Sequence, residues 1–211
     1  RVRKDLDYID NLNMIGYDYE GKNDLENACE YFISALDLLK KVKGGRSDEY
    51  LKNAYYLAFI YEKAKNYMEA KNYYEQSVEL IKVFAGETHP YYAEALNKLA
   101  NTLLHLGNQN KALTLRIKAL NIIKNIVGEN HLYYASSLKN IADIYFQKND
   151  FTRAKKMYRE SIEIKKKILG ENSEEYIRDS AMLAKTYINT SDYETAESIL
   201  CSLSEKSKKN K

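Results

Sequence analysis

The sequence has few of the residues that make turns and almost no cysteine. Its 211 residues include 8 Gly, 1 Pro, 2 Cys and no Trp. Folds with many short strands need frequent turn residues, so this scarcity argues against a β-sandwich, a β-barrel or a collagen-like chain. Cys29 and Cys201 lie near opposite ends of the chain, and such low cysteine usage is typical of a reducing compartment. We interpret both as buried thiols and expect a cytoplasmic protein.

An excess of one charge and long apolar runs are also missing. Lys and Arg total 33 against 30 Asp and Glu, a net charge of +3, whereas proteins that bind nucleic acid usually show an overt basic field. No run approaches the roughly 18 consecutive apolar residues of a membrane-spanning helix. The first residues, RVRKDLDYID, lack the apolar core of a signal peptide. The composition therefore favours a soluble protein that neither binds nucleic acid nor inserts into a membrane.

A 42-residue repeat runs through the chain, as the step from Ala28 to Ala70 illustrates. Four kinds of residue recur at this step, and because their physical roles differ they indicate one supersecondary unit copied five times. The recurring residues are Ala28, Ala70, Ala112, Ala154 and Ala196; Gly44, Gly86, Gly128 and Gly170; Tyr50, Tyr92, Tyr134 and Tyr176; and Asp24, Asn66, Asn108, Asp150 and Asp192.

Each repeat is predicted to contain two helices. In the second repeat Ala54, Leu57, Ala58 and Tyr61 recur at the i, i+3, i+4, i+7 spacing of one helical face. The Asp/Asn column follows this helix and is placed to cap a second helix. The glycine column ends that second helix, because a left-handed C-cap costs least in glycine. Lysines in its last turns, Lys165 among them, suit the carbonyl end of the helix dipole.

Such a helix pair cannot bury its apolar face alone, so neighbouring pairs must stack. The sequence therefore predicts an all-α solenoid without strands, formed as a single array over residues 1–204. Residues 205–211 are expected to be a solvated basic tail. The predicted repeats cover residues 9–50, 51–92, 93–134, 135–176 and 177–204.

The repeat columns resemble those of the tetratricopeptide repeat (TPR) family. The resemblance rests on the alanine column, on a later aromatic such as Tyr61, and on the large-small pairs Leu57 Ala58, Leu99 Ala100, Ile141 Ala142 and Leu183 Ala184. A usual repeat of this family has about 34 residues. The longer period here and the loops AGETHPYY, VGENHLYY and LGENSEEY are similar to those of kinesin light chains and nephrocystin-like proteins. The resemblance implies a right-handed superhelix that serves as a non-catalytic protein-binding scaffold or adaptor.

Motifs for catalysis are missing from the sequence. It contains no G-x-S-x-G, no Walker loop, no G-x-G-x-x-G and no H-E-x-x-H. His89 and His131 share one loop column, but no set of carboxylates and cysteines completes a tetrahedral metal site around them. We interpret them as solvent-exposed loop residues and predict no enzymatic activity, no metal and no cofactor.

The 20 tyrosines leave two interpretations. Aromatic residues interleaved with lysines can stack on the bases of single-stranded nucleic acid. Most of these tyrosines, however, fall in repeat columns that face neighbouring helices, which favours a role in packing.

The resemblance also implies a peptide-binding groove on the face of each first helix that points away from its core stripe. Large apolar side chains on that face would anchor a partner, asparagines would pair with the main chain of an extended peptide, and cations would attract its acidic residues. The candidate groove residues are Tyr55, Phe59, Asn97, Asn101, Leu104, Lys139, Phe146, Arg178 and Lys185. The same columns on this face also hold Tyr17, Lys52 and Glu94.

Two functional hypotheses follow. In the first, the protein is an adaptor that binds a short peptide, with acidic residues and an apolar anchor, in this groove. In the second, it is a structural subunit that packs by its convex face or its ends into a larger assembly. The sequence leaves self-association open.

Overall fold

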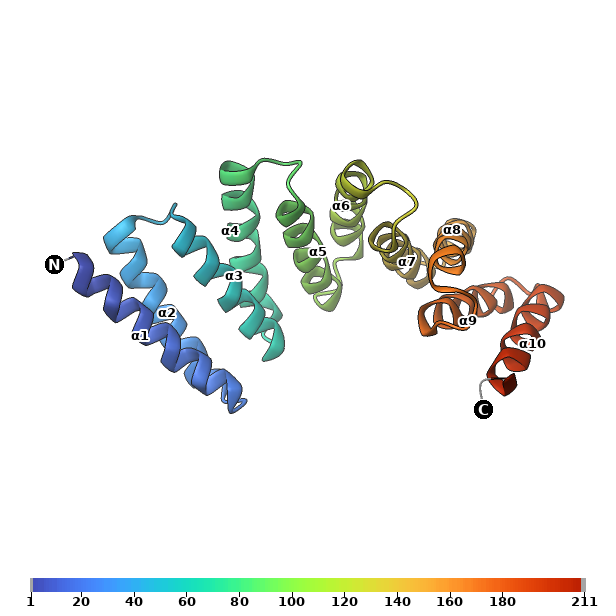
Figure 1. The fold of residues 1–211 in the computed structure, drawn as a ribbon, viewed down its shortest axis with the longest axis horizontal. Helices are drawn as coiled ribbons and strands as arrows, with labels where there is room; N and C mark the ends of the chain where they lie inside the picture. The colour runs from blue at the N-terminus through green and yellow to red at the C-terminus, as the bar shows by residue number, and fades with distance from the viewer. Residues whose placement is uncertain (1, 210–211) are drawn as a thin grey trace. The chain divides into compact units, whose positions relative to one another are not determined.

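A computed structural model describes residues 2–209, and these residues form ten helices and no strand (Figure 1). Their order is five successive helix pairs, which confirms the all-α fold and the two helices predicted for each repeat. The helices are α1 (Val2–Gly21), α2 (Leu25–Lys43), α3 (Asp48–Lys63), α4 (Tyr67–Ala85), α5 (Pro90–His105), α6 (Gln109–Val127), α7 (Leu132–Gln147), α8 (Phe151–Leu169), α9 (Glu174–Ile188) and α10 (Tyr193–Lys209).

The helices group into two compact units, and the boundary falls within α6. The first unit ends at Leu115 and the second begins at Arg116. In the first unit α1 packs on α2, α2 on α3, α3 on α4 and α4 on α5. In the second unit α7 packs on α8, α8 on α9 and α9 on α10. The helix α10 continues to Lys209, so most of the segment expected to be a tail is helical. The rest of that segment, residues 210–211, lies outside the described residues.

The Asp/Asn column caps the second helix of every pair, as predicted. In each case the side-chain oxygen accepts a hydrogen bond from the backbone N–H three residues later, at 3.2–3.4 Å. The residue before each cap has a positive φ between 58° and 75°, a feature that the sequence analysis missed. Only one of these five residues is a glycine. They are Asn23, Lys65, Gly107, Asn149 and Ser191.

The glycine column ends these helices in a conformation that differs from the predicted left-handed cap. Gly44, Gly86 and Gly170 combine φ of 81–86° with ψ of 162–167°. This region of φ/ψ space is essentially restricted to glycine. These positions therefore tolerate other residues even less than a left-handed cap would.

His89 and His131 are N-caps and not free loop residues. Their Nδ1 atoms accept hydrogen bonds from the backbone N–H groups of Tyr91 and Tyr133, at 3.2 and 3.1 Å. The same repeat column holds serine caps at the start of α3 and α9. The two histidines therefore have a structural role in starting α5 and α7.

The core follows the repeat columns. The alanine column is at most 2% exposed. In the predicted stripe of α3, Ala54, Leu57 and Ala58 are buried and Tyr61 is half-buried. A Cβ added to Gly16 would lie 2.8 Å from the ring of Phe32, which shows how closely the two helices approach there. The tyrosine column packs as expected, since the buried Tyr50 and Tyr134 also donate their hydroxyls to side chains on the second helix of the pair.

Two predictions about single side chains are wrong. Cys29 is buried, and burial raises the pKa of its thiol to about 11, but Cys201 is exposed on α10, which packs mainly on α9. Lys165, predicted to suit the carbonyl end of the helix dipole, lies before the last turn of α8, which holds Lys166 and Lys167. It is buried between α8 and α9, where its ammonium group pairs with Asp179 at 2.6 Å.

Candidate functional site

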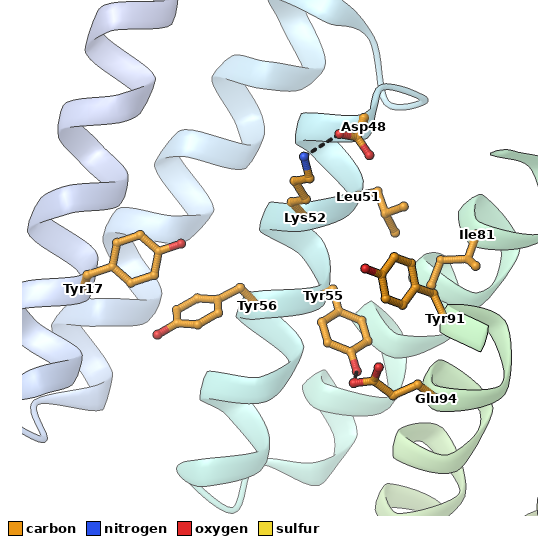
Figure 2. A pocket seen from close by; sticks show the side chains of 9 residues that line it. All are labelled: Tyr17, Asp48, Leu51, Lys52, Tyr55, Tyr56, Ile81, Tyr91 and Glu94. Atoms are coloured by element: carbon orange, nitrogen blue, oxygen red, sulfur yellow. Dashed lines mark hydrogen bonds and ion pairs between the residues drawn. The ribbon is translucent and has the colours of Figure 1, made fainter. Parts of the chain in front are cut away.

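A pocket of about 510 Å³ opens on the face that α1, α3 and α5 share in the first unit (Figure 2). We call it the tyrosine pocket, because four tyrosines form most of its wall. It is lined by Tyr17, Asp48, Leu51, Lys52, Tyr55, Tyr56, Ile81, Tyr91 and Glu94.

Hydrogen bonds and ring contacts hold the walls of the tyrosine pocket. The Tyr55 hydroxyl donates to Glu94 Oε1 at 3.0 Å and so links α3 to α5. Tyr17 and Tyr56 meet edge to face with their centroids 4.8 Å apart, which links α1 to α3. Figure 2 shows Tyr91 beside Tyr55, with the Tyr17–Tyr56 pair on the α1 side. The helices that supply the walls are therefore connected through the pocket itself.

The tyrosine pocket is aromatic and weakly acidic. Lys52 pairs with Asp48 at 2.6 Å, which leaves Glu94 as the excess charge of the lining. Burial raises the pKa of Tyr56 to about 12 and also raises that of Tyr17, so both phenols are neutral at physiological pH. Such a surface offers rings for apolar or cationic groups and hydroxyls for hydrogen bonds.

Tyr55, a candidate groove residue, lines the pocket. Tyr17, Lys52 and Glu94, which stand in the same columns of the predicted groove face, line it too. Phe59 is half-buried next to it, with its ring 5.8 Å from that of Tyr56 and 5.5 Å from Lys98 Nζ. The remaining three, Asn97, Asn101 and Leu104, are half-buried on α5 and do not line the pocket.

In the second unit the predicted groove residues differ in their surroundings. Lys139 forms an ion pair with Asp143 at 2.7 Å, so its charge is compensated. Asp143 also accepts a hydrogen bond from the Tyr158 hydroxyl at 2.6 Å. The buried Arg116 interacts favourably with Asp143, although desolvation is the stronger effect and lowers the pKa of the Arg116 guanidinium. Lys139 is thus part of a local network.

Phe146 and Lys185 do come together in the second unit. Lys185 Nζ lies 5.4 Å from the centre of the Phe146 ring. The Phe146 and Phe151 rings pack edge to face, with their centroids 5.6 Å apart. Arg178 is exposed on α9, the same helix as Lys185. This unit therefore presents two accessible cations and one aromatic ring from the predicted set.

The pocket wall also contains residues that the predicted groove did not include, namely Asp48, Leu51, Tyr56, Ile81 and Tyr91. One signal was available, because Tyr91 precedes a member of the tyrosine column and the doublet recurs as Tyr133 and Tyr134. Tyr56 and Ile81 gave no such signal, since they reach the pocket through packing between repeats.

The part of the chain that the structure describes holds neither a metal-binding cluster nor a helix suited to crossing a membrane. No group of three or more His, Cys, Asp or Glu side chains in this part is placed to hold a metal ion. None of its helices combines the length and the apolar character that crossing a membrane requires.

The chain is similar to known repeat proteins in sequence and in fold. The family model described as tetratricopeptide repeat matches residues 50–115 and 93–167. None of the curated proteins matches the chain in sequence.

Solved structures match almost the whole chain at low identity. A candidate kinesin light chain of Podosopora anserina with nearly identical TPR-like repeats has 17% identity and a TM-score of 0.82, with 97% of each chain covered. BtubC (BKLC) from P. vanneervenii has 16% identity and a TM-score of 0.78, over 98% of this chain and 89% of that one. The apo form of RapI has 16% identity and a TM-score of 0.79, over 96% and 71%. These matches confirm the predicted all-α solenoid fold class.

Proposed function

Because the chain belongs to the tetratricopeptide repeat family, we propose that it is a non-catalytic scaffold whose first unit binds a short peptide segment of a partner protein in the tyrosine pocket. The fold of this family is typical of protein–protein interaction scaffolds. The similarity to a candidate kinesin light chain supports an adaptor role. Low cysteine usage favours the cytoplasm as its setting.

The observation that carries this proposal is the gathering of four tyrosines around one pocket, two of them largely exposed. Tyr91 is 65% exposed and Tyr17 is 48% exposed, although both are large side chains. Concave surfaces lined by aromatic groups and a few polar ones are the usual binding sites of proteins. Tyrosine is also enriched among the residues that dominate binding energy at interfaces.

The lining indicates what the peptide should contain. An apolar or aromatic side chain would bury itself between Tyr55 and Tyr91, and a basic neighbour would suit Glu94. In the second unit, Arg178 and Lys185 are proposed as a separate surface that attracts acidic residues. The partner chemistry therefore differs between the two units.

The test is affinity capture from the native lysate with the full chain and two double variants. Tyr55→Ala with Tyr91→Ala removes two walls of the pocket. The control, Tyr8→Ala with Met68→Ala, removes two exposed apolar side chains of the first unit outside the pocket. We expect a specific protein to be lost from the pocket variant and retained by the control, both variants being folded by circular dichroism. Equal retention by the two variants would exclude the pocket as the binding site.

A second candidate function, a structural subunit in a larger assembly, is favoured by the surface of α9 and α10. Ile188, Tyr193 and Leu200 are 44%, 64% and 43% exposed around a hollow of about 410 Å³. The column of Leu200 holds the buried Phe32 and Tyr158 in other repeats, so this position normally faces a neighbouring helix. If the surface serves assembly, Leu200→Glu should reduce the sedimentation coefficient of a self-associated chain, and an unchanged coefficient would exclude self-association through it.

A further inference from the structure

A second pocket, of about 430 Å³, lies on α8 and α9 in the second unit. Its lining contains three cations from one stretch of α8, and we call it the basic pocket. It is lined by Thr152, Lys155, Lys156, Arg159, Glu160 and Tyr187.

The three cations of the basic pocket are not neutralised by carboxylates of the described residues. The interactions of Lys155 are with the Tyr187 ring, 4.9 Å away, and with the Thr190 hydroxyl at 3.4 Å. Arg159 donates to the Tyr187 hydroxyl oxygen and lies 5.5 Å from the same ring. Lys156 is exposed and forms no ion pair in this part of the chain. Like charges one turn apart destabilise a helix, so this arrangement has a cost.

The repeat does not require these cations. At the equivalent positions α4 has Lys71, Asn72 and Glu75, and there the lysine and the glutamate pair at 3.0 Å. The equivalent residues of α6 are Leu113, Thr114 and Ile117, which carry no charge. Other repeats thus fold with uncharged or ion-paired side chains at the same positions. The packing of the repeat therefore does not explain why three cations that form no ion pair with the described residues lie together in the basic pocket.

The one acidic residue of the lining is already engaged. Glu160 Oε1 accepts a hydrogen bond from the Tyr134 hydroxyl at 3.1 Å. The remaining groups are donors, namely two ammonium groups, a guanidinium and the hydroxyls of Thr152 and Tyr187. Because the Tyr187 oxygen accepts from Arg159, its own O–H is available to donate toward the pocket. The three cations and one carboxylate give the lining a net charge of +2.

We propose that the basic pocket binds a phosphorylated side chain on a segment of a partner protein. A phosphorylated Ser, Thr or Tyr carries a charge of about −1.5 to −2 at pH 7 and three strong acceptor oxygens. This matches the net charge and the donor set of the lining, whereas a single carboxylate would compensate only half of the charge. The Arg159 guanidinium keeps donors free beyond its bond to Tyr187, as bidentate binding of phosphate requires.

The charge distribution favours a phosphorylated protein over nucleic acid. Nucleic acids are bound by rows of cations that neutralise many phosphates, about six to ten in a typical complex. The whole chain carries a net charge of only +3, and the uncompensated cations of the basic pocket are confined to about one turn of α8. A site for one phosphate group is the better fit.

Oriented peptide libraries test this proposal with the full chain. Each library fixes a central phosphoserine, phosphothreonine or phosphotyrosine between degenerate positions, and matched libraries carry the unphosphorylated residue. We expect at least one phosphorylated library to retain the labelled protein at least about tenfold better than its counterpart, since hydrogen bonds to charged groups contribute strongly. Equal retention with and without phosphate would overturn the proposal.

Two double variants with the same charge change locate the site. Lys155→Gln with Lys156→Gln should reduce retention by at least about tenfold. Lys166→Gln with Lys167→Gln, on the same helix but outside the basic pocket, should change it by less than about twofold, because exposed charges at this distance are largely screened. Equal losses of retention in the two variants would show that the general positive charge of α8 attracts the peptide, and would contradict a specific site at the basic pocket.

The same variants separate other anionic ligands. Single-stranded DNA, or phosphatidylcholine vesicles containing a phosphoinositide, should bind the chain more weakly than the selected phosphopeptide at physiological salt. Tighter binding of either probe that depends on Lys155 and Lys156 would overturn the proposal in favour of that ligand. The tyrosine pocket lies in the other unit, so its variants report on the proposed function independently of this site.

Discussion

Asp179 and Lys165 form a buried ion pair between α9 and α8, with 2.6 Å between the carboxylate and the ammonium group. Their side chains are 0% and 5% exposed. Ser161 donates a second hydrogen bond to the same carboxylate oxygen at 2.8 Å, while the other oxygen, Oδ1, has no partner in the described part of the chain. Two repeats earlier the equivalent positions hold Ile81 and Ala95, which are both buried and apolar.

Removing one partner of this pair should destabilise the chain strongly. Asp179→Ala leaves a buried ammonium group without a counter-charge, and we expect the free energy of unfolding to fall by about 3–5 kcal/mol. The double variant Lys165→Ile, Asp179→Ala introduces the apolar residues found at the equivalent positions 81 and 95 and should be about as stable as the original or more so. Urea unfolding followed by circular dichroism measures both. A double variant as unstable as the single one would show that the ion pair contributes net stability.

Substitutions at the positive-φ positions before the N-caps should change the free energy of unfolding in opposite directions. Gly107 has φ of 75°, and a Cβ added there would meet nothing within 4 Å. Gly107→Ala should therefore lower the free energy of unfolding by about 1–2 kcal/mol, which is the backbone strain of alanine in a left-handed conformation. Lys65 has φ of 60°, and Lys65→Gly should stabilise the chain by up to about 1 kcal/mol. Thermal unfolding of the two variants should therefore shift in opposite directions. A loss of stability in Lys65→Gly would show that the lysine side chain compensates for the strain.

The repeat columns predicted the helix pairs, their caps and most of the core, because each column reports a local requirement that recurs. The buried ion pair was missed for a different reason. Lys165 stands in a column that is otherwise apolar, as Ile81 shows, but the column of Asp179 also holds the polar Asn53 and Ser137. Only the packing of α8 on α9 shows that Lys165 and Asp179 meet. The tyrosine pocket was found only in part, since side chains such as Ile81 reach it from other helices.

Several tyrosines should ionise late in an alkaline titration. Burial raises the pKa of Tyr56, Tyr61 and Tyr134 to about 12 from the ordinary value of about 10, and hydrogen bonds to carboxylates add to the effect at Tyr56 and Tyr134. The unfolded chain releases these protons first, so stability should be constant below about pH 10 and fall as the pH rises toward 12. Absorbance near 295 nm, followed from pH 8 to 13, should show an early and a late group. A single transition near pH 10 in the folded chain would contradict this.

Lys139 and Lys185, predicted from the sequence to share one role in peptide binding, should differ in what their substitution changes. Lys139 is paired with Asp143 at 2.7 Å, so Lys139→Gln should lower stability by up to about 1 kcal/mol and leave peptide binding unchanged.

Lys185 lies over the Phe146 ring with its ammonium group exposed, and Arg178 is exposed on the same helix. Reversing both to Glu should weaken binding of an acidic peptide by about tenfold or more at low salt, with little change in the free energy of unfolding. Fluorescence anisotropy with a polyglutamate peptide that carries one phenylalanine, measured at two salt concentrations, checks this. Because the attraction is electrostatic, the difference between the original chain and the reversed variant must shrink as salt rises. A salt-independent loss would instead point to a change in packing around Phe146.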